Sequence, residues 1–253
     1  MAMISTQTTP CPYDLARIRR AKGEHRIAVI IPAFNEDRSI LRVLEDIPGA
    51  LVDEIVVVNN NSTDNTASIA AAAGATVLHE PRRGYGSACL TGVAYVLAKG
   101  YDTIVFIDAD YSDHPEEMTE LVEKLTLENY EMVIGSRAMG EREEGAMLPQ
   151  ALFGNWLATR LMKLIWGAQF SDLGPFRAIR ADALRRIGMR DTNYGWTIEM
   201  QIKATQLGLR CTEIPVSYRR RIGVSKITGT IGGTVKAGWK ILFTIARYGL
   251  GRR

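Results

Sequence analysis

Short apolar runs alternate with amphipathic segments along the first half of the chain. The apolar runs, rich in Val and Ile, lie at residues 26–32, 54–59, 75–79, 104–107 and 131–135. Segments with helical spacing of apolar residues separate them, at residues 37–47, 65–73, 87–98 and 115–127. Short continuous apolar runs are typical of strands that are buried on both faces. Their alternation with helices predicts an α/β fold with a mostly parallel, Rossmann-like sheet flanked by helices.

The second half of the chain is less regular. We expect helices at residues 150–167, 182–187 and 197–207, and strands at residues 176–180 and 213–218. The 253 residues contain 46% hydrophobic residues, which suits one domain with a full-sized core. The predicted organisation is a loosely ordered lead-in at residues 1–25, a single domain at residues 26–226 and a basic amphipathic helical tail at residues 227–253.

Two carboxylates follow the strand at residues 104–107, in the sequence Asp108-Ala109-Asp110. On an extended backbone the two Asp side chains point the same way, and they offer the hard oxygen ligands that Mg²⁺ and Mn²⁺ prefer. An ion held by so few protein ligands has positions left for substrate phosphate oxygens. The alternative is an ordinary strand-to-helix turn, in which an Asp or Ser caps the helix that begins near Pro115.

Polar side chains gather where the predicted strands end. Because parallel strands end at one edge of the sheet, we expect these side chains to face a single crevice. They are Asn35, Glu36, Asn60, Asp64, Arg82, Arg83, Asp108 and Asp110.

Charge and cysteine content limit the kinds of partner. The net charge of +3 is too small to indicate nucleic acid binding. Residues 217–253, however, contain nine Lys and Arg and no Asp or Glu, so this end should seek phosphate groups or an anionic surface. The three cysteines lack paired spacing, which indicates neither a zinc site nor a disulfide framework and fits a reducing cytosolic setting. We find no signal-peptide pattern at the N-terminus.

Five ordered motifs carry a family resemblance. They are VIIPAFNE at residues 29–36, NNSTDNT at residues 60–66, Asp108-Ala109-Asp110, GSR at residues 135–137 and DLGPFR at residues 172–177. With these motifs the chain resembles the family 2 glycosyltransferases, which have the GT-A fold. It most resembles the polyprenyl-phosphate (dolichyl-phosphate) mannose and glucose synthases, a narrower likeness carried by Asp108-Ala109-Asp110 and by RRIGVSK at residues 220–226.

The resemblance implies a role for each motif. Asp108 and Asp110 would bind an Mg²⁺ or Mn²⁺ ion that bridges the donor diphosphate and neutralises the departing nucleotide. Phosphate oxygens of donor or acceptor would be gripped by Arg137, Arg220, Ser225 and Lys226. The nucleotide-sugar would be held by Pro32, Ala33, Asn35, Glu36, Asn60, Asp64, Arg82, Arg83 and Ala109. Many relatives have two Asp residues where this chain has Asn59–Asn61, so UDP- and GDP-hexose donors both stay open.

The expected activity is inverting transfer of a hexose to polyprenyl phosphate at the cytosolic face of a membrane. A phosphate acceptor is already anionic, whereas an alcohol acceptor needs a general base, for which Asp172 and Glu199 are the candidates. Glu199 can equally be a residue near a helix N-terminus that the helix dipole favours. A soluble or lipid alcohol acceptor and a non-catalytic sugar-nucleotide or membrane-binding module are the alternatives. The apolar segment at residues 231–250, interrupted by Lys236, Lys240 and Arg247, is either an interfacial helix making peripheral membrane contact or a helix packed on the domain.

Overall fold

The structure, a computed structural model, describes residues 16, 19, 25–223 and 231–250. The predicted lead-in therefore lies almost wholly outside the described residues, and so do Ser225 and Lys226.

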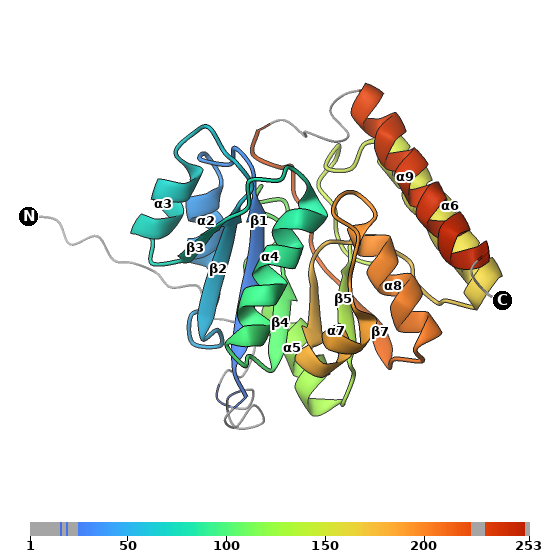
Figure 1. Cartoon of the computed structure of the whole chain (residues 1–253), viewed down its shortest axis with the longest axis horizontal. Coiled ribbons are helices and arrows are strands. Elements are labelled where there is room, and N and C mark those ends of the chain that lie inside the picture. Colours follow the sequence, from blue (N-terminus) through green and yellow to red (C-terminus); the bar gives the residue numbers. More distant parts are fainter. Residues whose placement is uncertain (1–15, 17–18, 20–24, 224–230, 251–253) are drawn as a thin grey trace, which may run out of the picture.

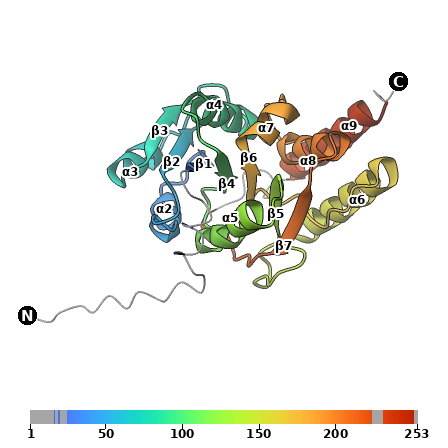
Figure 2. The same cartoon turned by 90° about the horizontal axis from the view of Figure 1, so that it is seen from below.

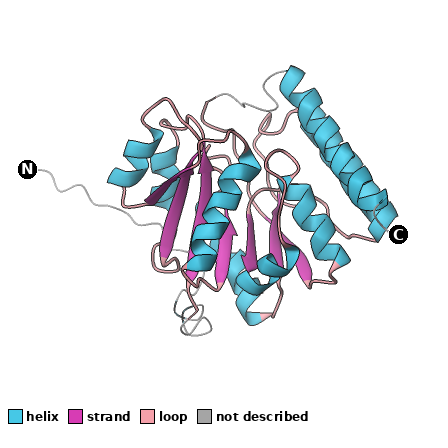
Figure 3. Cartoon of the chain, in the orientation of Figure 1, coloured by secondary structure: helices cyan, strands magenta, loops and turns pink. Residues whose placement is uncertain are grey.

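In the described part of the chain, seven strands form one sheet in the order β3-β2-β1-β4-β6-β5-β7. Figure 3 shows the strands in magenta and the helices around them in cyan. All neighbouring strands are parallel except β6, which runs antiparallel to both β4 and β5. The mostly parallel sheet predicted from the sequence is thus confirmed. The strands are β1 (Ile27–Ala33), β2 (Glu54–Asn59), β3 (Thr76–His79), β4 (Thr103–Phe106), β5 (Met132–Ser136), β6 (Arg177–Arg180) and β7 (Cys211–Pro215).

Helices cover both faces of the sheet (Figure 2). One face carries α2 (Ile40–Asp46), α3 (Thr66–Ala72), the 3-10 turn η1 (Pro115–Glu117) and α5 (Met118–Leu127). The other face carries α4 (Tyr85–Ala98), α7 (Ala181–Ile187) and α8 (Trp196–Gln206).

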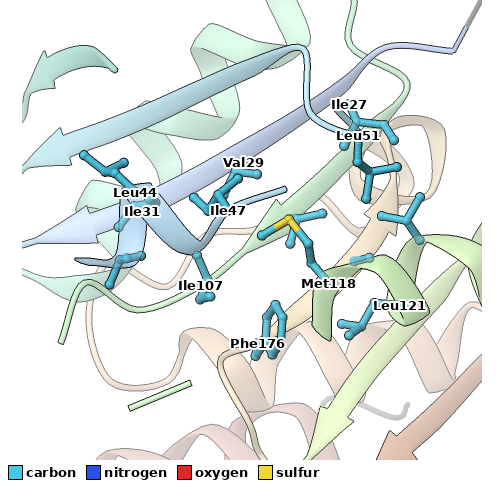
Figure 4. Close-up of a cluster of buried hydrophobic side chains, with 14 of the residues drawn as sticks. Ile27, Val29, Ile31, Leu44, Ile47, Leu51, Ile107, Met118, Leu121 and Phe176 are labelled. Atoms are coloured by element: carbon cyan, nitrogen blue, oxygen red, sulfur yellow. The ribbon is translucent and has the colours of Figure 1, made fainter. Parts of the chain in front are cut away.

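The alternation of side chains along each strand divides the core into two layers. Val29 and Ile31 of β1 join the layer with Met118 and Leu121, which Figure 4 shows together with Phe176. The neighbouring residues of β1, Ala28 and Ile30, join the opposite layer. Because both faces of the strand are buried, the sequence reads as a continuous apolar run.

Two long helices lie side by side at one end of the sheet, α6 (Pro149–Trp166) and α9 (Ile231–Leu250) (Figure 1). Ile245 of α9 is buried against Met162 of α6 and Ile202 of α8. Residues 231–250 of the predicted tail are therefore helical and pack on the domain. No helix among the described residues combines the length and the apolar character that crossing a bilayer requires.

Several element boundaries differ from the sequence prediction, and two of these differences have a clear cause in the fold. Strand β7 ends at Pro215 rather than Tyr218, because its partner β5 ends at Ser136, which lies opposite Pro215. Helix α4 begins at Tyr85, two residues earlier than expected, directly after Gly84 with its φ of 153°. A side chain at Gly84 would lie 2.2 Å from the Thr192 carbonyl oxygen, so the start of α4 is fitted against the loop before α8.

Candidate active site

The loops that follow β1, β2, β3 and β4 meet at the carboxyl edge of the sheet, where they enclose a crevice of about 290 Å³. The loop before α8 and the segment after β7 complete its wall. Its lining residues are Pro32, Ala33, Phe34, Glu36, Asn60, Arg83, Gly84, Tyr85, Ala88, Asp108, Ala109, Asp110, Asn193, Tyr194 and Arg221. Five of the eight side chains expected to face one crevice line it, namely Glu36, Asn60, Arg83, Asp108 and Asp110.

Asp108 and Asp110 lie on the crevice wall, and different neighbours orient them. The Tyr85 hydroxyl donates to Asp108 Oδ1 at 3.0 Å. The Ser112 backbone N–H donates to Asp110 Oδ1 at 2.9 Å, while Arg221 Nη2 lies 3.1 Å from Asp110 Oδ2. Asp108 Oδ2 takes part in none of these contacts, and a cation on Asp110 Oδ2 would have to replace the contact with Arg221.

Electrostatics at this pair favour a bound cation. Burial, followed by repulsion from the Asp110 carboxylate, raises the pKa of Asp108 above its ordinary value. Burial and the Asp108 charge likewise raise the pKa of the Tyr85 hydroxyl, which stays protonated and acts as the donor. A divalent cation would offset the repulsion between the two carboxylates. These two hard oxygen donors fit Mg²⁺ or Mn²⁺, with other coordination positions left to phosphate oxygens and water.

Three of the residues predicted to hold the nucleotide-sugar are not among the lining residues of the crevice. Asn35 Oδ1 accepts from the Thr63 N–H at 2.8 Å, which joins the loops after β1 and β2. Asp64 Oδ1 accepts from the Thr66 N–H at 3.0 Å at the start of α3. Arg82 pairs with Glu80 at 3.0 Å and is largely exposed. These residues shape the loops and do not line the crevice.

Asn60 does line the crevice, but its amide is occupied by the backbone of the next loop. Nδ2 donates to the carbonyl oxygens of Glu80 and Arg82 at 3.1 and 2.8 Å, and Oδ1 accepts from the Gly84 N–H at 2.8 Å. An Asp could accept the Gly84 bond but could not donate to the two carbonyls. The Asn at this position, where many relatives have Asp, is therefore suited to the backbone of residues 80–84.

The lining of the crevice includes a cationic group stacked on an aromatic ring. The Arg83 guanidinium lies 3.8 Å from the centroid of the Phe34 ring, and both residues line the crevice. Stacked guanidinium and aromatic planes are surfaces on which planar groups such as nucleobases pack.

Asp172 is bonded to Arg137 through two parallel hydrogen bonds, from Nε to Oδ2 and from Nη2 to Oδ1, both 2.8 Å. The Arg137 backbone N–H adds a third bond of 2.8 Å to Oδ2. Burial disfavours the charge on Asp172, but the Arg137 charge and these bonds outweigh burial and lower the pKa of Asp172. Asp172 thus holds Arg137 in place, and Nη1 of Arg137 lies outside this pairing.

Glu199 lies away from the crevice, in a network beside α9. Oε2 accepts from the Asp191 N–H at 2.7 Å, and Oε1 accepts from the Tyr248 hydroxyl at 2.6 Å. Lys203 Nζ is 2.7 Å from Oε1, one helical turn along α8. The carboxylate is buried and fixes the loop before α8 to the tail helix, as a structural residue would.

The three arginines after β7 point to different partners. Arg219 lies over the Tyr111 ring, and Arg220 donates to the Glu144 carbonyl oxygen at 2.6 Å, outside the crevice. Arg221, rather than the predicted Arg220, lines the crevice. The crevice is also lined by Tyr85 and Tyr194, which were not predicted from the sequence. Their signals, a tyrosine between two glycines and an aromatic residue before an expected helix, are weak without the fold.

A second, more apolar groove of about 480 Å³ adjoins the crevice. Tyr85, Asp108 and Tyr194 line both hollows. From there the groove runs past Arg137 to α6 and α9, where Phe153 and Leu242 are among its lining residues. A crevice with paired carboxylates thus opens into a more apolar groove that has Arg137 among its lining residues.

The fold has close counterparts among solved structures. Glucosyl-3-phosphoglycerate synthase from Mycobacterium tuberculosis, solved in complex with Mn²⁺, UDP and phosphoglyceric acid, superimposes with a TM-score of 0.76 at 23% identity. The match covers 94% of this chain and 83% of that chain. The architecture is the GT-A fold predicted from the sequence motifs.

The sequence defines the family. Residues 28–188 match the sequence model described as Glycosyl transferase family 2. An undecaprenyl-phosphate mannosyltransferase from Micrococcus luteus is 30% identical over 249 residues, covering 90% of this chain and 96% of that protein. A dolichyl-phosphate hexose transferase from Haloferax volcanii is 32% identical over 211 residues, covering 82% and 89%. The chain belongs to glycosyl transferase family 2.

Proposed function

We propose that this glycosyltransferase moves a hexose from a nucleoside-diphosphate sugar to polyprenyl phosphate, with an Mg²⁺ or Mn²⁺ ion bound by Asp108 and Asp110. The observation that carries the proposal is the apolar groove that meets the crevice at Asp108 and passes Arg137. Polyprenyl phosphate has an anionic head and an apolar tail, which match Arg137 and the groove between α6 and α9. Both relatives described above are named for such lipid phosphates.

In the proposed reaction a phosphate oxygen of the acceptor attacks the anomeric carbon of the sugar. The bond between that carbon and the donor diphosphate oxygen breaks, and the nucleoside diphosphate leaves with the electron pair. Attack from the face opposite the leaving group inverts the anomeric centre. When bound, the metal ion supplies charge stabilisation for the leaving diphosphate. Asp108 and Asp110 bind it, Tyr85 orients Asp108, and Arg137 holds the acceptor phosphate beside the sugar.

The positions of Asp172 and Glu199 favour a phosphate acceptor. An alcohol acceptor must lose a proton during attack and calls for a free carboxylate or imidazole near the anomeric carbon. Asp172 is ion-paired with Arg137, and Glu199 is bonded to Tyr248 and Lys203 away from the crevice. A phosphate acceptor needs no such base.

The test is a transfer assay with Mn²⁺, a panel of UDP- and GDP-hexoses, and short-chain polyprenyl phosphate compared with the matching polyprenol. We expect a glycosylated product with the phosphate alone, with the anomeric configuration inverted relative to the donor by NMR. The same panel identifies the base. Product from the polyprenol would instead support an alcohol acceptor, and donor hydrolysis without transfer to either lipid would overturn the proposed acceptor class.

We further propose that the α6–α9 pair rests on the cytosolic surface of a membrane. Trp239 and Phe243 of α9 are 71% and 49% exposed, and Phe153 and Trp156 of α6 are 61% and 53% exposed. Exposed basic residues accompany these aromatic side chains, namely Lys236, Arg247, Arg160 and Lys163. Large exposed apolar side chains among cations match a bilayer with anionic lipid headgroups. Such a surface would present a lipid acceptor to the groove.

We expect the double variant Trp239→Ser with Phe243→Ser to bind anionic phosphatidylglycerol vesicles at least about tenfold more weakly than the wild-type protein in co-sedimentation. The matched control is Leu41→Ser with Leu207→Ser, which removes two side chains that are each 42% exposed but lie on α2 and after α8. The control should bind as the wild type does. Equal vesicle binding by all three proteins would contradict the proposed surface.

A further inference from the structure

Arg221 reaches the crevice at the carboxylate that is proposed to bind the metal ion. Its Nη2 lies 3.1 Å from Asp110 Oδ2 and 3.3 Å from Glu36 Oε1. The Ile222 N–H donates to the Asp110 carbonyl oxygen at 3.0 Å, which holds the backbone after Arg221 against the Asp110 loop. The backbone next to Arg221 is thus fixed, while rotation of the Arg221 side chain can move its guanidinium.

Arg221 and a metal ion would compete for the same oxygen of Asp110. Asp110 Oδ1 already accepts the Ser112 N–H and hydroxyl, so Oδ2 is the oxygen that remains, and Arg221 holds it. A divalent cation bound to the same oxygen would lie within a few ångströms of the guanidinium. Like charges at that distance, in a partly buried crevice, repel strongly.

The present partners do not satisfy all the donors of Arg221. Its Nε is buried and has no hydrogen-bond partner among the described residues. A guanidinium is a planar fork whose Nε and Nη groups match two oxygens of one phosphate. An oxyanion in the crevice would therefore satisfy this side chain more completely than Asp110 and Glu36 do.

We propose that Arg221 exchanges partners, leaving Asp110 and Glu36 for the donor diphosphate when a metal–nucleotide complex enters the crevice. The inference rests on the proposed function. A metal ion alone must displace Arg221 without giving it a new partner, so it binds weakly. A metal ion with a nucleoside diphosphate provides that partner, so the two ligands bind cooperatively and Arg221 carries part of the coupling.

The test measures Mn²⁺ binding to the full chain by the electron paramagnetic resonance signal of free Mn²⁺, with and without UDP or GDP. We expect Arg221→Ala to bind Mn²⁺ alone at least about tenfold more tightly than the wild type, a coupling of about 1.4 kcal/mol. The enhancement of Mn²⁺ binding by the nucleotide should fall by a similar factor. Arg221→Lys, which keeps the charge but loses the fork, should bind Mn²⁺ alone as weakly as the wild type.

Arg220→Ala is the matched control, because it removes the same charge from the adjacent residue, which lies outside the crevice. It should leave both Mn²⁺ affinities unchanged. Mn²⁺ binding to Arg221→Ala that is no tighter than to the wild type would overturn the exchange. Asp110→Ala separates the two hypotheses: if it binds Mn²⁺ as well as the wild type does, the proposed metal site itself is wrong and the exchange falls with it.

Discussion

Replacing Asp110 by Ala is expected to lower kcat for sugar transfer on the order of 1000-fold. The proposed metal ion would lose one of its two protein ligands, and with it the charge stabilisation of the leaving diphosphate. Such stabilisation contributes several kcal/mol, and each 1.4 kcal/mol corresponds to about a tenfold change in rate. The measurement is steady-state transfer across a range of Mn²⁺ concentrations, with the donor and acceptor identified by the panel assay.

The control for this variant is Asp182→Ala, which makes the same charge change at an exposed position in the first turn of α7. Asp182→Ala should keep wild-type kcat. Because Asp110 also accepts bonds from Ser112, Asp110→Asn is measured alongside, with circular dichroism to verify the fold of both variants. Transfer by folded Asp110→Ala at a rate near that of the wild type would exclude Asp110 from the catalytic machinery.

Replacing Asp172 by Asn is expected to reduce the free energy of unfolding by about 3–5 kcal/mol. The change removes the carboxylate that is ion-paired with the Arg137 guanidinium, in a site where Asp172 is fully buried. An unpaired buried charge costs this much because desolvation is no longer offset by the partner. Urea unfolding at pH 7 measures the difference.

The double variant Arg137→Met with Asp172→Leu is the control for Asp172→Asn. Removing both charges together should recover most of the lost stability, because no buried charge is then left without its partner and buried ion pairs are often replaced by apolar residues without net cost. A loss below about 1 kcal/mol in Asp172→Asn, together with abolished transfer, would contradict the structural role and support Asp172 as a general base.

The stability difference between the wild type and Asp172→Asn should also depend on pH. Because the pKa of Asp172 in the folded chain lies below its ordinary value of 3.8, the ionised form stabilises the fold at every pH above that value. As the pH falls below about 4, the unfolded chain takes up a proton first and the contribution is lost. The difference should thus stay constant between about pH 5 and 8 and shrink below about pH 4.

The sequence predicted most of the architecture because the early strands are buried on both faces. Runs such as residues 54–59 can be read without tertiary information, and the carboxyl ends of parallel strands must share an edge. The reversal of β6 could not be read locally, because a four-residue strand fits either direction. The end of β7 at Pro215 depends on where β5 ends, which is likewise a property of the sheet.

Candidate site residues could be predicted where they directly follow a strand, because the strand sets where the chain reaches the sheet edge. Residues on longer segments were predicted less well. Asp108 and Asp110 follow directly from the end of β4. Arg220 and Arg221 are adjacent and chemically identical, and only the path of the segment after β7 decides which one enters the crevice. Glu199 is a residue type that can act as a base. It is held away from the crevice by Lys203, one turn along the same helix, and by Tyr248, which is distant in the sequence.

The reversed direction of β6 makes residues 138–171 a segment that could be exchanged as a unit. Because β6 runs opposite to β5, the chain leaves the carboxyl edge after Ser136 and returns to the same edge at Asp172, and the Arg137–Asp172 ion pair closes the two ends of that excursion. Residues 138–171, which include α6, form an outward loop anchored at its base. Exchange of residues 138–171 between family members offers a way to alter acceptor choice while the donor crevice keeps its shape.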